Sequence, residues 1–183
     1  MSEAWVQTWG GECFDLLEPE AGQVFFADIA HALSNICRFN GHCTRFYSVA
    51  EHSVVMSRLV PSDLARWALF HDATEAYVGD MVRPLKEILP AFKRIEEGVA
   101  RAIAKRFGLG DRPAALRVHD LRMLATEAEQ LMDGQRRPWG SLQGVAPFDV
   151  ALPCWPPQEA ARQFFARFGE IEADRVRREK AAA

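Results

Sequence analysis

The chain has 183 residues, which is the usual size of one domain, so we expect a single domain over residues 1–183. Hydrophobic residues make up 49% of the chain and charged residues 26%, proportions that indicate a folded protein and exclude a disordered one. The formal charge of -3 offers no basic surface, so we expect no binding to duplex nucleic acid or to a membrane.

The sequence also bears on location and redox state. No stretch has the roughly 18 uninterrupted apolar residues of a transmembrane helix, and residues 1–11 lack the basic and apolar regions of a signal peptide. We therefore expect a cytoplasmic protein. The four cysteines show no CxxC spacing, and we expect them to be reduced packing residues.

The first elements expected are a hairpin and a helix. Two short extended runs flank Gly10-Gly11 and predict a small β-hairpin at the N-terminus. Asp28 is a good N-cap residue for a helix over residues 29–39, which Asn40-Gly41 would end.

Two further helices follow. Ser48 and Glu51 have the spacing of a capping box, which predicts that a helix begins at Ser48 with His52 in its early turns. After a break at Pro61, residues 64–77 continue in helical period.

Glycine and proline then interrupt the pattern. Gly79-Asp80 and Pro84 predict an irregular connection, which places Asp80, Arg83 and Lys86 on or beside a loop. Loops that join rigid helices are where functional residues gather.

The rest of the chain is also predicted to be helical. An amphipathic helix should run through residues 92–107, another should reach about Met132, and a third should cover about residues 158–178. The Pro- and Gly-rich stretch 136–157 predicts a surface excursion. The fold class is therefore all-α with a small N-terminal β-hairpin.

A cluster of titratable residues carries the chemistry. His71 and Glu75 are one helical turn apart, and Asp72 lies beside them, so an imidazole and two carboxylates gather near one face. His71 also shares the apolar stripe of Leu64 and Trp67, which points it inward, where a metal ion would satisfy the group.

A second His-Asp pair stands later in the chain. In His119-Asp120 the flanking Leu116 and Leu124 place the Asp, rather than the His, on the buried edge of its helix. The metal ligands predicted from three helices are therefore His52, His71, Asp72 and Asp120. Such a mixed nitrogen and oxygen set suits Zn²⁺, Mn²⁺, Fe²⁺, Co²⁺ or Ni²⁺ and argues against a thiolate-rich structural zinc site.

This ordered set resembles a known family. His52, His71-Asp72, Asp80 followed by Lys86, and the later Asp120 resemble the H…HD…D signature of HD-domain phosphohydrolases, in particular the bacterial and phage 5'-deoxynucleotidase-like subgroup. The resemblance covers about residues 28–132. A bare His-Asp pair is not specific, whereas the ordered set at these offsets is.

The resemblance implies a fold, an activity and residue roles. It implies an HD-domain helical bundle that hydrolyses a phosphate ester of a small nucleotide with a divalent transition metal. Glu75 and Asp80 would orient or deprotonate the attacking water, and Arg38 and Lys86 would hold phosphate. Arg45 also precedes His52 and is the alternative to Arg38.

Other interpretations stay open. The favoured substrate is the 5'-phosphate of a deoxynucleotide; the alternatives are a triphosphohydrolase that releases triphosphate from a dATP-type substrate, and a non-catalytic metal- or nucleotide-binding module. Glu75, Asp80 and Lys86 could instead be solvated surface residues. A homo-oligomer that takes a small nucleotide as substrate is expected, with no duplex nucleic acid or membrane as partner.

Overall fold

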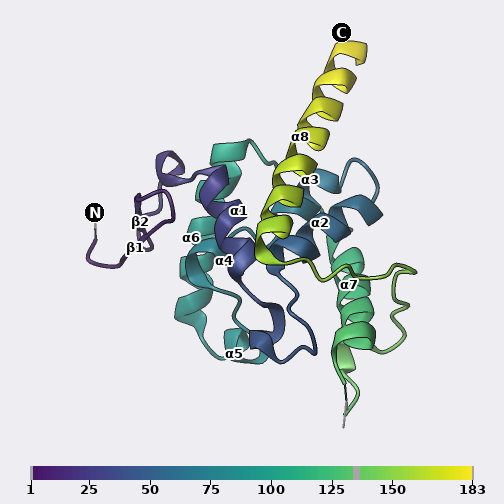
Figure 1. The fold of residues 1–183 in the computed structure, drawn as a ribbon. Helices are drawn as coiled ribbons and strands as arrows, with labels where there is room; N and C mark the ends of the chain where they lie inside the picture. Colours follow the sequence, from purple (N-terminus) through teal and green to yellow (C-terminus); the bar gives the residue numbers. More distant parts are fainter. Residues whose placement is uncertain (1, 134–136, 183) are drawn as a thin grey trace.

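The computed structural model describes residues 2–133 and 137–182, and most of this part of the chain is helical (Figure 1). The expected fold class, all-α with a small N-terminal hairpin, is confirmed. Within the described ranges the elements in chain order are β1 (Trp5–Gln7), β2 (Cys13–Asp15), η1 (Ala21–Gln23), α1 (Phe26–Asn35), η2 (Arg38–Gly41), α2 (Val49–Leu59), α3 (Ala65–Phe70), α4 (Glu75–Val78), α5 (Arg83–Glu87), α6 (Pro90–Phe107), α7 (Leu116–Leu131), η3 (Gly140–Leu142) and α8 (Pro157–Ala182).

The two strands form an antiparallel hairpin at one side of the molecule (Figure 1). Val6 pairs with Phe14, and the Phe14 side chain is fully buried against Tyr77, with the ring centroids 3.9 Å apart. The hairpin is therefore attached to the helices through an aromatic contact, which adds about 0.5–1.5 kcal/mol to the burial of the ring itself.

Helix α1 differs from its predicted limits at both ends. It begins at Phe26, so Asp28 is not the N-cap; Asp28 is buried in the first turn and accepts a hydrogen bond from the Gly10 N–H at 2.7 Å. It ends at Asn35, because the next residues leave the helix and Cys37 forms a β-bridge with Ser48. The Asp side chain serves the hairpin turn rather than the helix end.

Helix α2 is the central element of the bundle. Every residue from Val49 to Ser57 is buried, and the helix packs against α1, α3, α7 and α8. Figure 1 shows α8 lying across α1, α2 and α3, with its C-terminal end projecting beyond the bundle. A polar side chain on α2 is therefore held inside the molecule.

A cluster of phenylalanines joins four helices around the end of α3. Phe26 of α1 lies 4.2 Å from Phe168 of α8 between ring centroids, and Phe70 lies 4.6 Å from Phe107 of α6. Phe70 is the last residue of α3 and directly precedes His71. The cluster thus fixes the backbone at the point where the candidate site begins.

Helices α6 and α7 end at or within one residue of the limits predicted from the sequence. Helix α6 ends at Phe107, and the following Gly108 adopts the left-handed conformation (φ 59°) that closes many helices. Helix α7 ends at Leu131, one residue before the expected limit, whereas α8 extends four residues past residue 178.

The stretch predicted as a surface excursion begins at Arg136, which lies outside the described residues. Its described part returns along α7, where the Gln130 side chain donates to the Val150 carbonyl (2.7 Å) and accepts from the Leu152 N–H (3.0 Å). The excursion then reaches α2 at Cys154 and Trp155, whose N–H groups both donate to Glu51.

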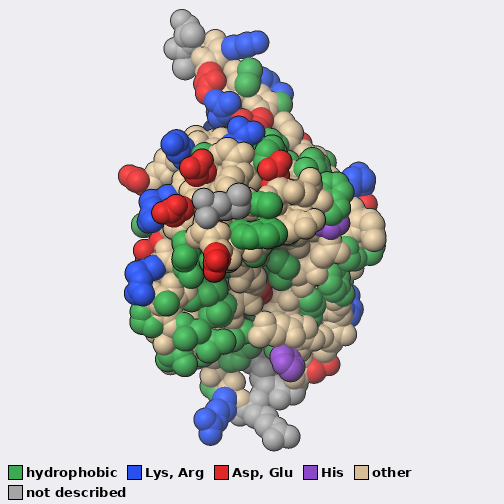
Figure 2. Space-filling view, turned by 90° about the vertical axis from the view of Figure 1, so that its left-hand side faces the viewer, with side chains coloured by type: hydrophobic (Ala, Val, Ile, Leu, Met, Phe, Trp, Pro, Cys, Tyr) green, Lys and Arg blue, Asp and Glu red, His purple; other side chains and the backbone are tan. Residues whose placement is uncertain are grey.

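No helix within residues 2–133 and 137–182 combines the length and the apolar character that crossing a bilayer requires. Figure 2 shows the face that lies on the left in Figure 1, where hydrophobic side chains gather in its lower half and charged side chains are scattered above them.

Candidate metal centre

The first turn of α2 places His52. Ser48 caps this helix, because its Oγ accepts a hydrogen bond from the Glu51 N–H at 3.1 Å, so the predicted helix start is confirmed. The Glu51 side chain does not complete a capping box, since its two oxygens accept from Cys154 and Trp155. His52 is fully buried and its ring points to the interior.

His71 and Asp72 lie in a break that the sequence did not predict. The helix expected over residues 64–77 is divided into α3 and α4, with residues 71–74 in a turn between them. The N–H of Ala73 donates to the Phe70 carbonyl and that of Glu75 to the Asp72 carbonyl, both at 3.0 Å, so this turn is wound more tightly than an α-helix. His71 is also held by its own Nδ1, which lies 2.7 Å from the Ala68 carbonyl oxygen.

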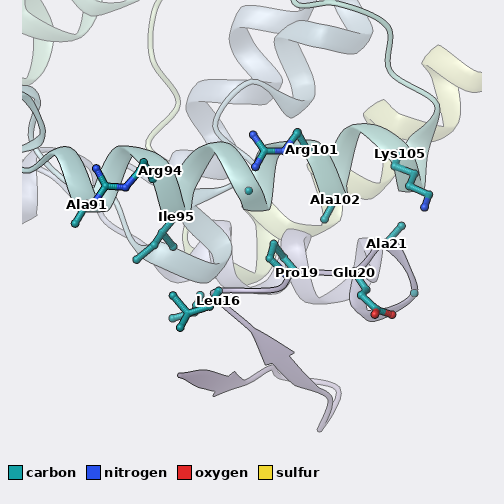
Figure 3. Close-up of a pocket in the computed structure, with 13 residues that line it drawn as sticks. Leu16, Pro19, Glu20, Ala21, Ala91, Arg94, Ile95, Arg101, Ala102 and Lys105 are labelled. Atoms are coloured by element: carbon teal, nitrogen blue, oxygen red, sulfur yellow. The ribbon is translucent and has the colours of Figure 1, made fainter. Parts of the chain in front are cut away.

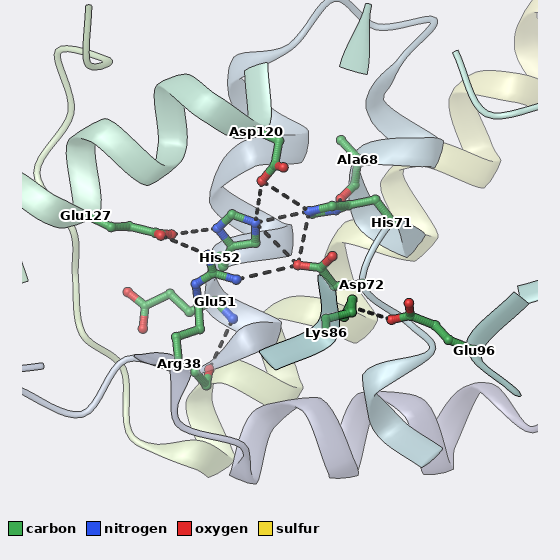
Figure 4. Close-up of polar contacts among 11 residues, drawn as sticks. Arg38, Glu51, His52, Ala68, His71, Asp72, Lys86, Glu96, Asp120 and Glu127 are labelled. Atoms are coloured by element: carbon green, nitrogen blue, oxygen red, sulfur yellow. Dashed lines mark hydrogen bonds and ion pairs between the residues drawn. The ribbon is translucent and has the colours of Figure 1, made fainter. Parts of the chain in front are cut away.

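Three side chains converge at this point (Figure 4). The Nε2 atoms of His52 and His71 are 3.0 Å apart, and Asp72 Oδ2 lies 3.1 Å from His71 Nε2 and 3.6 Å from His52 Nε2. One ligand atom from each residue lies within 4.8 Å of the others. This buried group could hold a metal ion.

Hydrogen bonds define the tautomers of the two histidines. His71 Nδ1 faces the Ala68 carbonyl oxygen, and His52 Nδ1 faces Glu127 Oε1 at 2.5 Å. A carbonyl oxygen and a carboxylate only accept, so each Nδ1 carries a hydrogen, and the neutral form of each ring offers its lone pair on Nε2. Two lone pairs and a carboxylate oxygen therefore face one another, an arrangement that a cation between them would stabilise.

The donor set also fits a metal ion by distance and by type. Two nitrogens bound at about 2.1 Å and at right angles to one ion would be about 3.0 Å apart, which is the separation of His52 Nε2 and His71 Nε2. Imidazole nitrogen and carboxylate oxygen are ligands that first-row divalent metals accept.

Helix α7 brings the fourth predicted ligand to the same place. Asp120 Oδ1 lies 3.6 Å from His52 Nε2 and 3.8 Å from His71 Nε2. The structure thus gathers His52, His71, Asp72 and Asp120 from α2, the α3–α4 turn and α7 (Figure 4).

Glu127 is a residue of this centre that the sequence pattern did not predict. This residue is fully buried on α7, accepts from His52 Nδ1, and also accepts from the Arg38 guanidinium at 3.0 Å. One signal could have revealed it: Glu127 follows Asp120 by two helical turns, on the same face, and has the small Ala128 as its neighbour. A carboxylate on a buried helix face needs partners of opposite charge.

Arg38 supplies that charge at the edge of the centre. Its guanidinium contacts Glu127 at 3.0 Å and Asp72 at 3.5 Å. Burial raises the pKa of Glu127, but Arg38 and His52 outweigh burial and hold the pKa below its usual value. Burial also opposes ionisation of Asp72, yet His71, His52 and Arg38 together hold its pKa low. Both carboxylates are therefore ionised at neutral pH.

The carboxyl groups of Glu75 and Asp80 have raised pKa values, in contrast to those of Asp72 and Glu127. Glu75 is buried at the start of α4, and its Oε2 has no hydrogen-bond partner in the described part of the chain. Burial, with the nearby charges of Asp72 and Asp80, raises the pKa of Glu75 well above its usual value. Burial raises the pKa of Asp80 as well, and Asp72 adds to this while Arg38 opposes it. These two carboxyl groups are thus able to hold a proton beside the centre.

The segment after Asp80 corrects one expectation. Asp80 lies in an irregular connection as predicted, but Arg83 and Lys86 belong to the short helix α5, which Pro84 helps to start. The Lys86 ammonium donates to Glu96 Oε1 at 2.6 Å, and it lies close enough to Asp80 to lower the pKa of that carboxyl. The lysine therefore lies near Asp80 while its ammonium is bound to Glu96.

The alternative cation, Arg45, and one further histidine, His31, lie outside the centre. Arg45 is exposed, whereas Arg38 is buried against the centre. His31 stacks on Trp9 with ring centroids 4.6 Å apart, away from the four predicted ligands. Of the two arginines considered, Arg38 is the one that the fold places beside Asp72.

One groove of the described surface lies apart from this centre. It has a volume of about 860 Å³ and lies between residues 16–22 and α6 (Figure 3). Arg94, Arg101 and Lys105 line it, and none of the predicted site residues does. This groove therefore shares no residue with the candidate metal centre.

The fold and the site define the class of this protein: a mostly helical protein whose buried His52, His71 and Asp72 could hold a metal ion. No family model matches the chain. It is 39% identical over 171 residues to the uncharacterized protein YfdR of Escherichia coli (strain K12), an alignment that covers 92% of this chain and 96% of YfdR. It is 33% identical over 186 residues to an uncharacterized protein of Rhodobacter capsulatus, with 91% of this chain and 95% of that protein covered. The chain belongs to the same family as these two proteins.

Proposed function

We propose that this protein is a metal-dependent phosphohydrolase of the HD-domain type that removes the 5'-phosphate from deoxynucleotides. The observation that carries the proposal is the convergence of the His52 and His71 Nε2 lone pairs with the carboxylates of Asp72 and Asp120. The substrate class comes from the resemblance of the ordered residues to the deoxynucleotidase-like subgroup.

The four converging residues would hold the metal. His52, His71, Asp72 and Asp120 offer two nitrogens and two carboxylates, which leaves coordination positions open for water and substrate. A bound divalent metal would lower the pKa of water and offset the charge of the phosphate. Glu127 would keep the His52 ring in the tautomer that presents Nε2.

Two cations would bind the remaining phosphate oxygens. Arg38 has a guanidinium at the edge of the cluster, with one nitrogen 3.5 Å from Asp72, and Lys86 lies on the opposite side of Asp72 in Figure 4. Charge-assisted hydrogen bonds from these groups would orient the phosphate toward the four ligands.

Two carboxyl groups would move the protons. The Glu75 Oε2 atom is buried and free of a partner among the described residues, and the raised pKa of this carboxyl group suits a role in accepting a proton. Asp80, with a pKa raised in the same direction, would share that proton or pass it to the leaving oxygen.

The test is a substrate panel on the purified full chain. Deoxynucleoside mono-, di- and triphosphates would be incubated with Co²⁺, Mn²⁺, Zn²⁺ or Ni²⁺, and the released phosphate species identified by ³¹P NMR. We expect orthophosphate from monophosphates, and its loss in Asp72→Ala, with His31→Ala as the matched control outside the centre.

Each other result has a defined meaning. Tripolyphosphate released from a triphosphate would replace the nucleotidase with the triphosphohydrolase. No product with any of the metals, from a protein that binds them, would reject the enzyme in favour of a metal-binding module.

A further inference from the structure

Two of the four cysteines lie in contact beside the cluster. Cys37 Sγ and Cys43 Sγ are 3.5 Å apart, and both residues are free and half-buried. A disulfide needs the sulfurs at about 2.05 Å, so a movement of about 1.5 Å would join them. Cys13 and Cys154 lie on β2 and before α8, respectively, with no thiol contact among the described residues.

The backbone between the two cysteines folds back on itself. Phe39 (φ 57°), Asn40 (φ 51°) and Gly41 (φ 77°) occupy left-handed conformations in succession, and the His42 N–H donates to the Phe39 carbonyl at 3.0 Å. Three such residues in a row reverse the chain within one short loop. This reversal is what brings the thiols together.

Both ends of the loop are fixed to neighbouring segments. The Arg38 N–H donates to the Tyr47 carbonyl, and the Thr44 N–H donates to the Leu131 carbonyl at the end of α7, both at 2.9 Å. The thiol contact is therefore a property of the folded protein and does not depend on a chance loop conformation.

We propose that Cys37 and Cys43 form a reversible intramolecular disulfide in the presence of peroxide. The thiolate of one attacks a peroxide oxygen, forming a sulfenic acid and releasing water after proton uptake; the sulfur of the other then attacks this sulfur and releases a second water. In total, two thiols and one hydrogen peroxide give one disulfide and two waters. A dithiol reverses the reaction by thiol–disulfide exchange.

The disulfide would act on Arg38, a consequence that rests on the proposed function. Arg38 lies inside the loop that the bond closes, and its carbonyl accepts a weak hydrogen bond from the Cys43 thiol at 3.8 Å, which oxidation removes. The guanidinium contact with Asp72 is already long at 3.5 Å, so a shift of about 1 Å would break it. Oxidation should therefore weaken substrate binding.

Peptide mapping of the full chain tests the disulfide. Trypsin cleaves after Lys and Arg, and Arg38 and Arg45 are the first two such residues of the sequence, so it places Cys37 in peptide 1–38 and Cys43 in peptide 39–45. After peroxide treatment and alkylation we expect these peptides to be joined, and to separate with dithiothreitol. Because Cys13 shares peptide 1–38, the joined species must persist in Cys13→Ser and be absent in Cys37→Ser.

The outcomes separate the two proposals. Full alkylation of Cys37 and Cys43 after peroxide, or links only between chains, would overturn the disulfide. A KM for deoxynucleotide that rises about 10-fold on oxidation, recovers with dithiothreitol and stays constant in Cys43→Ser supports control through Arg38. An unchanged KM in oxidised protein overturns that control. A reduced protein without any hydrolysis removes the proposed function and this control with it, while the map still decides the disulfide.

Discussion

Glu127 and His52 are 75 positions apart in the sequence, and a 2.5 Å contact joins Glu127 Oε1 to His52 Nδ1 (Figure 4). The other oxygen of the same carboxylate accepts from Arg38. Glu127 thus connects a candidate metal ligand with a candidate phosphate-binding residue, without itself facing the four converging ligand atoms.

We expect Glu127→Gln to weaken metal binding by about 10- to 100-fold, because the acceptor that fixes the His52 tautomer loses its charge. The amide would also turn donors toward either His52 or Arg38. Titration against a chromophoric chelator measures the affinity. Glu129→Gln, an exposed position on the same helix, is the matched control, and equal affinities in the two variants would show that Glu127 does not position the histidine.

Local patterns were enough to predict the groups that converge. Ser48 caps α2 as its motif indicates, which places His52 inside the molecule, and the flanking leucines correctly direct Asp120 inward. These predictions depend on neighbours within one or two helical turns, where spacing determines which face a side chain occupies.

Tertiary contacts decide the features that the sequence did not reveal. Glu127 is explained only by His52 and Arg38, which come from distant parts of the chain. Asp28 has the residue type of an N-cap, yet it binds Gly10 of the hairpin turn because α1 starts earlier. In both cases the partner, rather than the local pattern, determines what the carboxylate does.

The metal ligands make the most direct prediction. The purified protein should bind one divalent transition metal per chain, and Ala at His52, His71, Asp72 or Asp120 should remove it, because each variant deletes a donor from a buried set. Elemental analysis after gel filtration measures the metal. Full occupancy in His71→Ala would contradict the assignment.

Glu75→Gln should keep the metal and lose about 100-fold or more in kcat, because an amide cannot accept the proton. The same change should remove a pH effect on stability. Burial raises the pKa of Glu75 in the folded protein above its unfolded value of about 4.3. The metal-free wild type should therefore lose stability as the pH rises from the unfolded pKa to the folded pKa of this group.

Thermal unfolding at several pH values, with Glu97→Gln as an exposed control, measures this difference. A Glu75→Gln variant with wild-type turnover would return Glu75 to a structural role.

The contact of Glu51 with the segment before α8 leads to a prediction about stability. Its buried carboxylate accepts the N–H groups of Cys154 (2.6 Å) and Trp155 (2.7 Å). Glu51→Gln should lower the free energy of unfolding by about 1–3 kcal/mol, because the amide can accept only through one oxygen. Urea denaturation compares Glu51→Gln with Glu12→Gln, a change at an exposed position. Equal unfolding midpoints would mean that the hydrogen bonds from Cys154 and Trp155 to Glu51 do not contribute to stability.

The phosphate-binding groups give the last prediction. Arg38→Ala and Lys86→Ala should each lower kcat/KM by about 10- to 100-fold, since a charge-assisted hydrogen bond to phosphate contributes about 1.5–3 kcal/mol. The loss should be similar for all bases, because phosphate carries no base identity.

Arg38→Ala also leaves Glu127 and Asp72 without their cation, so its unfolding midpoint should fall, whereas that of Lys86→Ala should change little. Arg38→Lys separates the two effects: it keeps the charge near both carboxylates but loses the planar pair of donors, so stability should largely return while kcat/KM stays low. The exposed Arg45→Ala is the control. If Arg45→Ala impairs hydrolysis while Arg38→Ala does not, the substrate reaches the metal from the other side of the loop.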